Sequence, residues 1–183
     1  SSSDGCAASD DVNVTVDTTY NADGNVASLT AVNSTTGSQT TQYVYGTTLA
    51  DSGIASSLLK RKEVYPDSVD SDDVIAFKYN RQGEVKEVRD QNGTVHAFDF
   101  DKLGRQTHDR ITTLGSGVDN AVLRISTEYE VRGLVFKITS YDAATSGNVV
   151  NEVQNEYNDF SQLTKQYQSH SGAVNTGTSP KVQ

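Results

Sequence analysis

The 183-residue chain contains no methionine, no tryptophan, one cysteine and only two prolines. Apolar residues make up 34% of it, less than a thick globular core of this length usually contains. No apolar run approaches the roughly 18 residues that a membrane-spanning helix requires. We therefore expect no membrane insertion, and we expect a sheet with one dry and one wet face in place of a thick core.

Positive charge is also scarce. The 15 basic residues are outnumbered by 24 acidic ones, which gives a net charge of −9. A field of that sign repels a phosphate backbone, so the charge argues against a nucleic-acid partner. The first nine residues lack the basic start and the apolar stretch of a signal peptide.

The single cysteine, Cys6, lies in a segment, residues 1–11, that we expect to be flexible. Two interpretations remain open for it. The first is an inert thiol, and the second is a disulfide to another chain or to a distant part of a longer one.

Strand-forming residues are plentiful, and one phrase built on them recurs. Nine tyrosines, five phenylalanines and many valines and threonines argue against disorder. The phrase is an aromatic residue, then Asn, Asp or Glu, two variable residues and Gly. Its copies are Tyr20-Asn21-Ala22-Asp23-Gly24, Tyr79-Asn80-Arg81-Gln82-Gly83, Phe100-Asp101-Lys102-Leu103-Gly104, Tyr129-Glu130-Val131-Arg132-Gly133 and, with Ser in place of Gly, Tyr157-Asn158-Asp159-Phe160-Ser161. The last four aromatic residues lie 21, 29 and 28 residues apart, within the range of repeat proteins.

The phrase predicts a hairpin turn. An Asp or Asn side chain at the first turn position accepts a hydrogen bond from the backbone N–H two residues on. A glycine at the fourth position takes a positive φ, which forms the bulge that matches strand twist. Asp90-Gln91-Asn92-Gly93 is the same turn without the aromatic residue. We expect positive φ at the five turn glycines, and either a cost or a different turn at Ser161.

Alternating apolar residues between the turns predict an all-β chain, an antiparallel hairpin meander that forms a spiral or solenoid sheet. The expected strands are 12–20, 25–32, 38–45, 58–65, 74–79, 84–89, 94–100, 105–113, 121–129, 134–141, 148–157 and 162–168. The only helical element expected is one turn near Ile54 to Leu59. Long polar connections are expected at 46–57, 66–73 and 169–180. The aromatic residues should project to one common face and contact aromatics of neighbouring repeats; they are Tyr43, Tyr45, Phe77, Tyr79, Phe98, Phe100, Tyr129 and Tyr157.

The segment Phe98-Asp99-Phe100-Asp101-Lys102-Leu103-Gly104-Arg105 resembles the YD-repeat signature of RHS proteins. Asp90-Gln91-Asn92-Gly93-Thr94 resembles the polar turn that precedes it in that family, and the resemblance covers roughly residues 12–168. It implies a continuous antiparallel sheet wound into a wall around a hollow, as in bacterial polymorphic toxins, insecticidal toxin complexes and the teneurin ectodomain. The chain departs from the family in lacking the self-cleaving terminal segment and in being too short to close a shell.

We accordingly expect three regions: a flexible start (1–11), tandem hairpin repeats (12–168) and the start of a further, truncated repeat (169–183). Lys181-Val182-Gln183 has the pattern of a strand that has just begun. A repeat array with uncovered edges exposes unpaired N–H and C=O groups. The expected partners are therefore the remaining repeats of a longer chain or further copies of this one.

No residues stand out as a metal or cofactor site. His96, His108 and His170 are scattered, and His96 is expected on the face of Phe98 and Phe100, facing the inner wall. The acidic run 67–73 lacks the glycine and distal glutamate of a calcium loop; a solvated loop is favoured over weak Ca²⁺ binding. Lys60-Arg61-Lys62 is expected to lie on an outer face or to guard a sheet edge.

No catalytic residues are identified either. No serine lies in a nucleophile elbow or beside a His–Asp pair, and no glycine-rich phosphate loop follows a strand. Glu84 and Glu87, or Asp99 and Asp101, lie close enough to meet, but nothing marks either pair as a glycosidase pair.

The expected function is therefore a non-catalytic wall segment of a large extracellular or cell-surface protein, with an encapsulated cargo as a further partner. The alternative is an adhesion or glycan-binding module on the same sheet, which would expose a contiguous aromatic patch. An enzyme ranks third.

Overall fold

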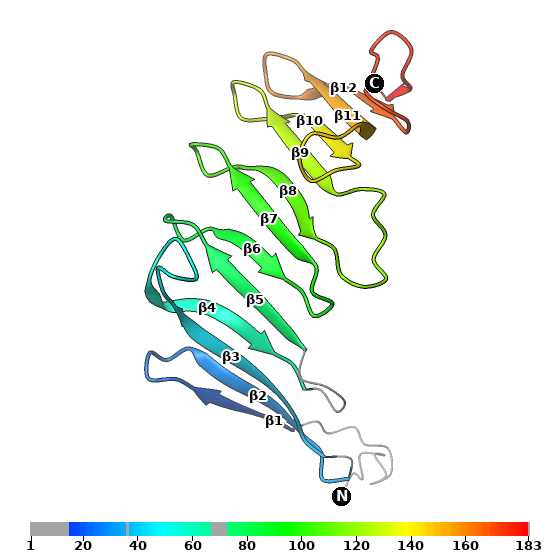
Figure 1. The fold of residues 1–183 in the computed structure, drawn as a ribbon. Coiled ribbons are helices and arrows are strands. Elements are labelled where there is room, and N and C mark those ends of the chain that lie inside the picture. The colour runs from blue at the N-terminus through cyan, green and yellow to red at the C-terminus, as the bar shows by residue number, and fades with distance from the viewer. Residues whose placement is uncertain (1–14, 36, 67–72, 183) are drawn as a thin grey trace, which may run out of the picture. The chain divides into compact units, whose positions relative to one another are not determined.

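The computed structural model describes residues 15–35, 37–66 and 73–182, and these form one antiparallel sheet with no helix (Figure 1). Its thirteen strands follow one another in sequence order, each beside the next, and the sheet is not closed. None of the described segments has a helix with the length and hydrophobicity for crossing a membrane. The strands are β1 (Thr15–Tyr20), β2 (Val26–Val32), β3 (Gln39–Thr47), β4 (Ser56–Val64), β5 (Val74–Tyr79), β6 (Val85–Arg89), β7 (Val95–Phe100), β8 (Gln106–Thr113), β9 (Arg124–Tyr129), β10 (Val135–Tyr141), β11 (Val149–Tyr157), β12 (Leu163–Ser169) and β13 (Lys181–Val182).

The expected strands and the observed ones agree closely, because the alternation of apolar and polar residues and the turn phrases are local signals. The strand expected at 121–129 begins at Arg124, and that expected at 12–20 is described from Thr15 on. Lys181–Val182 is indeed a strand, and it pairs with β12. Cys6 and acidic positions 67–72 lie outside the described residues.

The chain divides into two compact units at Lys78 and Tyr79. In the first unit, β1 is exposed along its whole length and pairs with β2. A cluster in this unit surrounds the Lys60 ammonium group, which lies 5.4 Å from the ring centre of Tyr43 and 5.2 Å from that of Phe77, and pairs with the Glu63 carboxylate. The Tyr65 hydroxyl donates to the same carboxylate, and this hydrogen bond raises the pKa of Tyr65 to about 12.

One expectation fails in the first unit, and one of two alternatives is excluded. The helical turn near Ile54 to Leu59 is wrong, because Ser56 begins β4 and pairs with Thr47 of β3. The chain turns earlier, where Ser52 N–H donates to the Thr48 carbonyl. Of the two alternatives for the basic run Lys60–Lys62, the edge guard is excluded, since β4 is flanked by β3 on one side and by β5 on the other. The outer face stays a prediction.

In the second unit, the hairpin turns alternate between two ends of the strands (Figure 1). We call one end the turn rim; it holds the short turns 80–84, 101–105, 130–134 and 158–162. The other end, the loop rim, holds the connections 90–94, 114–123, 142–148 and 170–180. The turn rim brings four copies of the aromatic–turn phrase to the same end of the sheet.

In β9 and β10, the apolar residues lie on the more exposed face of the sheet and the polar ones on the covered face. Ile125 and Ile138 share one face and are 44% and 39% exposed. Ser126 and Thr139 alternate with them on the opposite face and are 6% and 1% exposed. Alternation identifies which residues share a face, but burial depends on what covers that face. Further along the sheet, Tyr167 is buried on the same face as Thr139, and Asn155 is buried on the opposite one.

Candidate functional site: the turn rim

Three of the four turns on this rim, those that begin at Asn80, Asp101 and Asn158, are held by their own first side chain. The Asn80 Oδ1 atom accepts hydrogen bonds of 3.0 Å from the N–H groups of Gln82 and Glu84. Asp101 accepts from Leu103 and Arg105 in the same way. All five expected turn glycines have positive φ, as predicted; they are Gly24, Gly83, Gly93, Gly104 and Gly133. The turn geometry is therefore built into the repeated phrase.

Two turns depart from the phrase in sequence and retain its backbone. Ser161 has a φ of 65° and its N–H donates to the Asn158 carbonyl, so the non-glycine residue takes the strained conformation. At the β9–β10 turn, the longer Glu130 side chain binds the guanidinium of Arg132 with two hydrogen bonds of 2.8 Å. The backbone bond from Gly133 N–H to the Glu130 carbonyl is kept.

Neighbouring hairpins are joined at this rim by tyrosine hydroxyls. Tyr129, before the β9–β10 turn, donates to the Gln106 carbonyl of the preceding hairpin at 3.0 Å. Tyr157, before the β11–β12 turn, donates to the Val135 carbonyl at 2.8 Å. Both acceptors lie two residues after the turn glycine of the preceding hairpin. We call this repeated bond the tyrosine latch.

A second repeated contact involves the residue that follows each turn glycine. Glu84 follows Gly83, and its Oε1 atom lies 2.7 Å from the position a Cβ would take on Gly104 of the next turn. Arg105 follows Gly104, and its Nη1 atom lies 3.3 Å from the corresponding position on Gly133. The absence of a side chain on Gly104 and Gly133 therefore serves the neighbouring hairpin as well as the turn itself.

Arg105 has two further partners at this contact. Its guanidinium lies 4.3 Å from the ring centre of Tyr129 and binds the Asp101 carboxylate at 2.7 Å. Desolvation raises the pKa of Asp101, but hydrogen bonds from the backbone and side chain of Arg105 and from Leu103 outweigh it. The pKa of Asp101 therefore lies below its ordinary value of 3.8.

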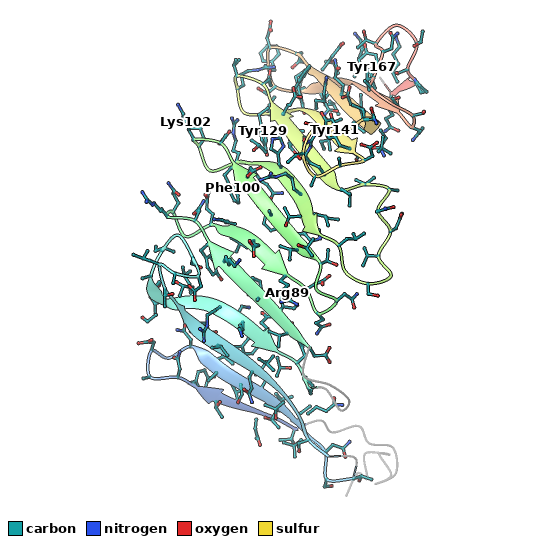
Figure 2. The ribbon with its side chains drawn as sticks, viewed as in Figure 1. Arg89, Phe100, Lys102, Tyr129, Tyr141 and Tyr167 are labelled. Carbon is teal, nitrogen blue, oxygen red and sulfur yellow. The ribbon has the colours of Figure 1, made fainter. Side chains whose placement is uncertain are left out.

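The contact between the β5–β6 and β7–β8 hairpins, which we call the first joint, lacks these features. Phe100 stands where Tyr129 and Tyr157 stand in later hairpins, so no hydroxyl can form the latch. Glu84 occupies the position that Arg105 has in the next joint. An open groove of about 330 Å³ lies there, and its lining includes Asn80, Glu84, Lys86, Phe98, Phe100 and Lys102. Figure 2 labels Phe100 and Lys102 beside the turn that joins β7 and β8.

A row of polar residues crosses the opposite, covered face of the second unit. Directly paired residues run from β7 to β12 in the order Asp99, His108, Ser126, Thr139, Glu152 and Ser169. The His108 Nδ1 and Ser126 Oγ atoms lie 3.0 Å apart, and the Thr139 hydroxyl donates to Glu152 Oε2 at 2.9 Å. Sequence reasoning missed this row, because it is formed by single residues of six separate strands.

Glu152 anchors the last connection of the loop rim to this row. Its carboxylate is 4% exposed and accepts a 3.0 Å hydrogen bond from the N–H of Val174, and Lys137 lies at 3.4 Å. The connection 170–180 thus lies over the row at this point. A buried carboxylate needs such partners, and here they come from β10, which supplies Thr139 and Lys137, and from the connection 170–180, which supplies Val174.

Several of the residues considered for catalysis or metal binding are engaged with other partners. Asp99 binds Arg110 at 2.8 Å and Asp101 binds Arg105, so these two acids do not face each other as a pair. His96, stacked on Phe98, binds Asp109 at 2.8 Å, while His170 is exposed in the connection 170–180. Within the described ranges, no three His, Cys, Asp or Glu side chains gather as metal ligands. Ser126 has a histidine neighbour but is 6% exposed, and the Asp99 beside that histidine is held by Arg110.

Within each unit, the aromatic residues that the strand register places share a face, whereas one face common to all eight stays a prediction; their ring partners differ from the expectation. The register places Phe98, Phe100, Tyr129 and Tyr157 on one face of the second unit. In the first unit, Tyr43, Tyr45 and Phe77 share a face by the same criterion. The rings of Tyr43, Phe77 and Tyr129 are covered by cations instead of by aromatics of the next repeat.

No protein-family model matches this chain, and no curated protein does. Among solved structures, the chain is similar to the crystal structure of TcdB2-TccC3-Cdc42, with a TM-score of 0.61 and 15% sequence identity over 84% of its length. It is also similar to that of TcdB2-TccC3-TEV, with a TM-score of 0.55 and 11% identity over 82%. The chain spans 7% of the length of each of those chains. At these identities the likeness shows a shared all-β fold.

Proposed function

We propose that the chain is a non-catalytic wall segment of a large extracellular RHS-type protein. The observation that carries the proposal is the tyrosine latch. Tyr129 and Tyr157 each bind the main chain of the preceding hairpin, so the recurring aromatic position of the phrase ties one hairpin to the next at these two places. A residue that serves a binding or catalytic site would instead be directed at a ligand. Here the hydroxyls of the repeated tyrosines bind the main chain of the neighbouring hairpin instead.

The comparisons support this proposal at the level of fold. The similar structures are named for complexes of TcdB2 and TccC3, and the sequence resembles RHS repeats, which form walls in insecticidal toxin complexes. A piece matching 7% of such a chain would be a small part of a continuous sheet. Its partners would then be the repeats on either side of it, with an enclosed cargo, and its location would be extracellular.

A glycan-binding or adhesion module would expose several aromatic side chains together. Of the described aromatic residues, Tyr20 and Phe160 are the strongly exposed ones, at 65% and 85%. They belong to different hairpins, in different units of the chain. This distribution favours the wall over the adhesion surface.

Cryo-electron microscopy of the native protein that carries this chain tests the proposal. In a wall, β1 and β13 would both be hydrogen-bonded to further strands of the same protein or of another copy. A chain that hangs from the particle as a separate module, with both edge strands in solvent, would contradict the wall. A glycan array probed with the same chain would then decide for or against the adhesion module.

A further inference from the structure

We propose that the groove at the first joint binds a guanidinium group from outside the chain. The inference goes beyond a wall function and does not depend on it. It rests on a comparison of the first joint with the contact between the β7–β8 and β9–β10 hairpins, which we call the second joint. There the chain itself supplies a guanidinium, that of Arg105.

In the second joint, three groups meet. The Arg105 guanidinium lies over the Tyr129 ring at 4.3 Å, binds the Asp101 carboxylate, and lies beside Gly133. A planar guanidinium is suited to this position because it can stack on an aromatic face while its N–H groups bind a carboxylate. The aromatic ring and the carboxylate are thus both satisfied within the chain.

In the first joint, the aromatic ring is present and its cation is missing. Phe100 is the ring equivalent to Tyr129, and among the described residues no lysine or arginine lies over it. Glu84 replaces the arginine, so a carboxylate lies beside Gly104 where the second joint has a cation. Asn80 stands where Asp101 stands in the second joint, so the acid of the first joint is Glu84 itself. An aromatic face and an acid are therefore present without a guanidinium.

The groove has the volume and the charge for such a ligand. About 330 Å³ is at the lower end of the range for small-molecule sites, which is about 300–1,000 Å³. Two of the nearby acids already have partners, because Asp99 binds Arg110 and Asp101 binds Arg105. Glu84 accepts a 2.6 Å hydrogen bond from the neutral amide of Asn80, and no described cation pairs with it. The net charge of −9 also attracts cations to the surface.

Two lysines, Lys86 and Lys102, line the same groove and select among cations. Their charge disfavours a diffuse accumulation of cations, so binding requires specific contacts with the ring of Phe100 and the carboxylate of Glu84. A guanidinium makes both contacts at once, whereas a compact ammonium group is more strongly hydrated and stacks less well.

The test is an NMR titration of the whole ¹⁵N-labelled chain with methylguanidinium and with N-acetyl-L-arginine amide. We expect amide signals of Glu84, Phe100 and Gly104 to shift, with a dissociation constant on the order of 1–10 mM for the arginine amide. Equal affinity for the two probes assigns the site to small guanidinium compounds, and tighter binding of the arginine amide assigns it to an arginine of a polypeptide. N-acetyl-L-lysine amide should bind several-fold more weakly.

Three variants make the assignment specific. Glu84→Arg places a guanidinium of the chain itself in the position of Arg105 and should abolish binding. Glu84→Gln removes the charge with little change of shape and should weaken binding at least tenfold. Glu128→Gln, which removes an exposed acid on β9, should bind like the original chain. If neither probe shifts those signals, if lysine amide binds equally well, or if Glu84→Gln binds unchanged, the proposal is overturned.

Discussion

At the residue scale, the turn glycines meet two separate demands. Gly83 and Gly104 both have positive φ, at 84° and 78°. A Cβ on Gly83 would meet nothing within 4 Å, whereas one on Gly104 would lie 2.7 Å from Glu84 Oε1. The two positions therefore separate the cost of backbone conformation from the cost of a contact between hairpins.

We expect Gly83→Ala to lower the free energy of unfolding by about 1 kcal/mol, because an alanine is strained at positive φ. Gly104→Ala should cost about 0.5–1 kcal/mol more, since Glu84 must move and release its hydrogen bond from Asn80. Urea denaturation measures both. In a Glu84→Ala background, the difference between the two alanine variants should vanish; if it persists, the contact is not its cause.

At Ser161 the opposite substitution, from a non-glycine residue to glycine at a positive φ, can be made. Its φ of 65° is one that glycine takes without strain. Ser161→Gly should therefore raise the free energy of unfolding by up to about 1 kcal/mol, as thermal or urea denaturation would show. An unchanged or lowered stability would mean that the Ser161 side chain contributes more than its backbone strain removes.

The turns could be predicted from the sequence because each depends on a few adjacent residues, as Asn80 and Gly83 illustrate. The contact of Glu84 with Gly104 could not, because it joins two hairpins and depends on how the sheet brings them together. The same holds for the groove beside Phe100. That groove is formed by residues of two hairpins, so its composition depends on how the sheet places them side by side.

At the scale of elements, the hairpin is the unit that the tyrosine latch connects. The latch acceptors, the carbonyls of Gln106 and Val135, have an equivalent in the first joint, the carbonyl of Val85, two residues after Gly83. Phe100 faces that joint without a hydroxyl. At the latch position, the first joint therefore lacks the hydroxyl oxygen that the rings of Tyr129 and Tyr157 carry in the other two.

Tyr129→Phe and Tyr157→Phe should each lower the free energy of unfolding by about 0.5–1.5 kcal/mol, the usual net contribution of one hydrogen bond. Phe100→Tyr should raise it by a similar or smaller amount, because the added hydroxyl can donate to Val85. Urea denaturation of the three variants measures these changes. Equal destabilisation by all three would show that the first joint does not have the geometry of the latch.

Strands were predictable from alternation, but the helical turn near Ile54 was not a correct prediction. Leucines at positions 58 and 59 favour a helix locally, whereas both neighbours of β4 offer main-chain partners to an extended segment. The pairing with β3 and β5 outweighs the local preference. Likewise, Ser126 and Thr139 are buried because other parts of the chain cover their face of the sheet. The alternation of apolar and polar residues does not predict which face will be covered.

At the scale of the whole molecule, carboxylates on several hairpins are held in their charged form. Hydrogen bonds from Asn148 lower the pKa of Asp142, and the Lys165 ammonium lowers that of Glu156. The pKa of Asp101 is lowered as well. A folded-state pKa below the ordinary value means that the stabilisation is complete above that value and is lost as the pH falls through the folded one.

We expect the urea midpoint to be constant near neutral pH and to fall below about pH 4–5. Asp101→Asn isolates one contribution, because Asn21, Asn80 and Asn158 form the same turn with an amide. This variant should be less stable than the original chain at pH 7 and should lose less stability between pH 5 and pH 2.5. Parallel pH curves for the two proteins would mean that Asp101 does not contribute to acid sensitivity.

The sequential strand order predicts the spectrum as well as the stability. Far-UV circular dichroism should show a β-sheet signal with almost no helix, since the described residues contain none. A helical content above about a quarter, near the average for globular domains, would contradict the fold.

The alternation of turns between two rims also limits which insertions of strands such a chain can accept during evolution. Insertion of one strand would move every later aromatic–turn phrase to the opposite rim and break its latch, whereas insertion of a complete hairpin would leave all of them in place. Within a hairpin, the uneven spacing of the phrases is absorbed on the loop rim, where 90–94 is short and 114–123 is long. In the second unit, a change in the number of whole hairpins or in the length of a loop-rim connection therefore preserves the latches, while the four turns of the turn rim keep one length.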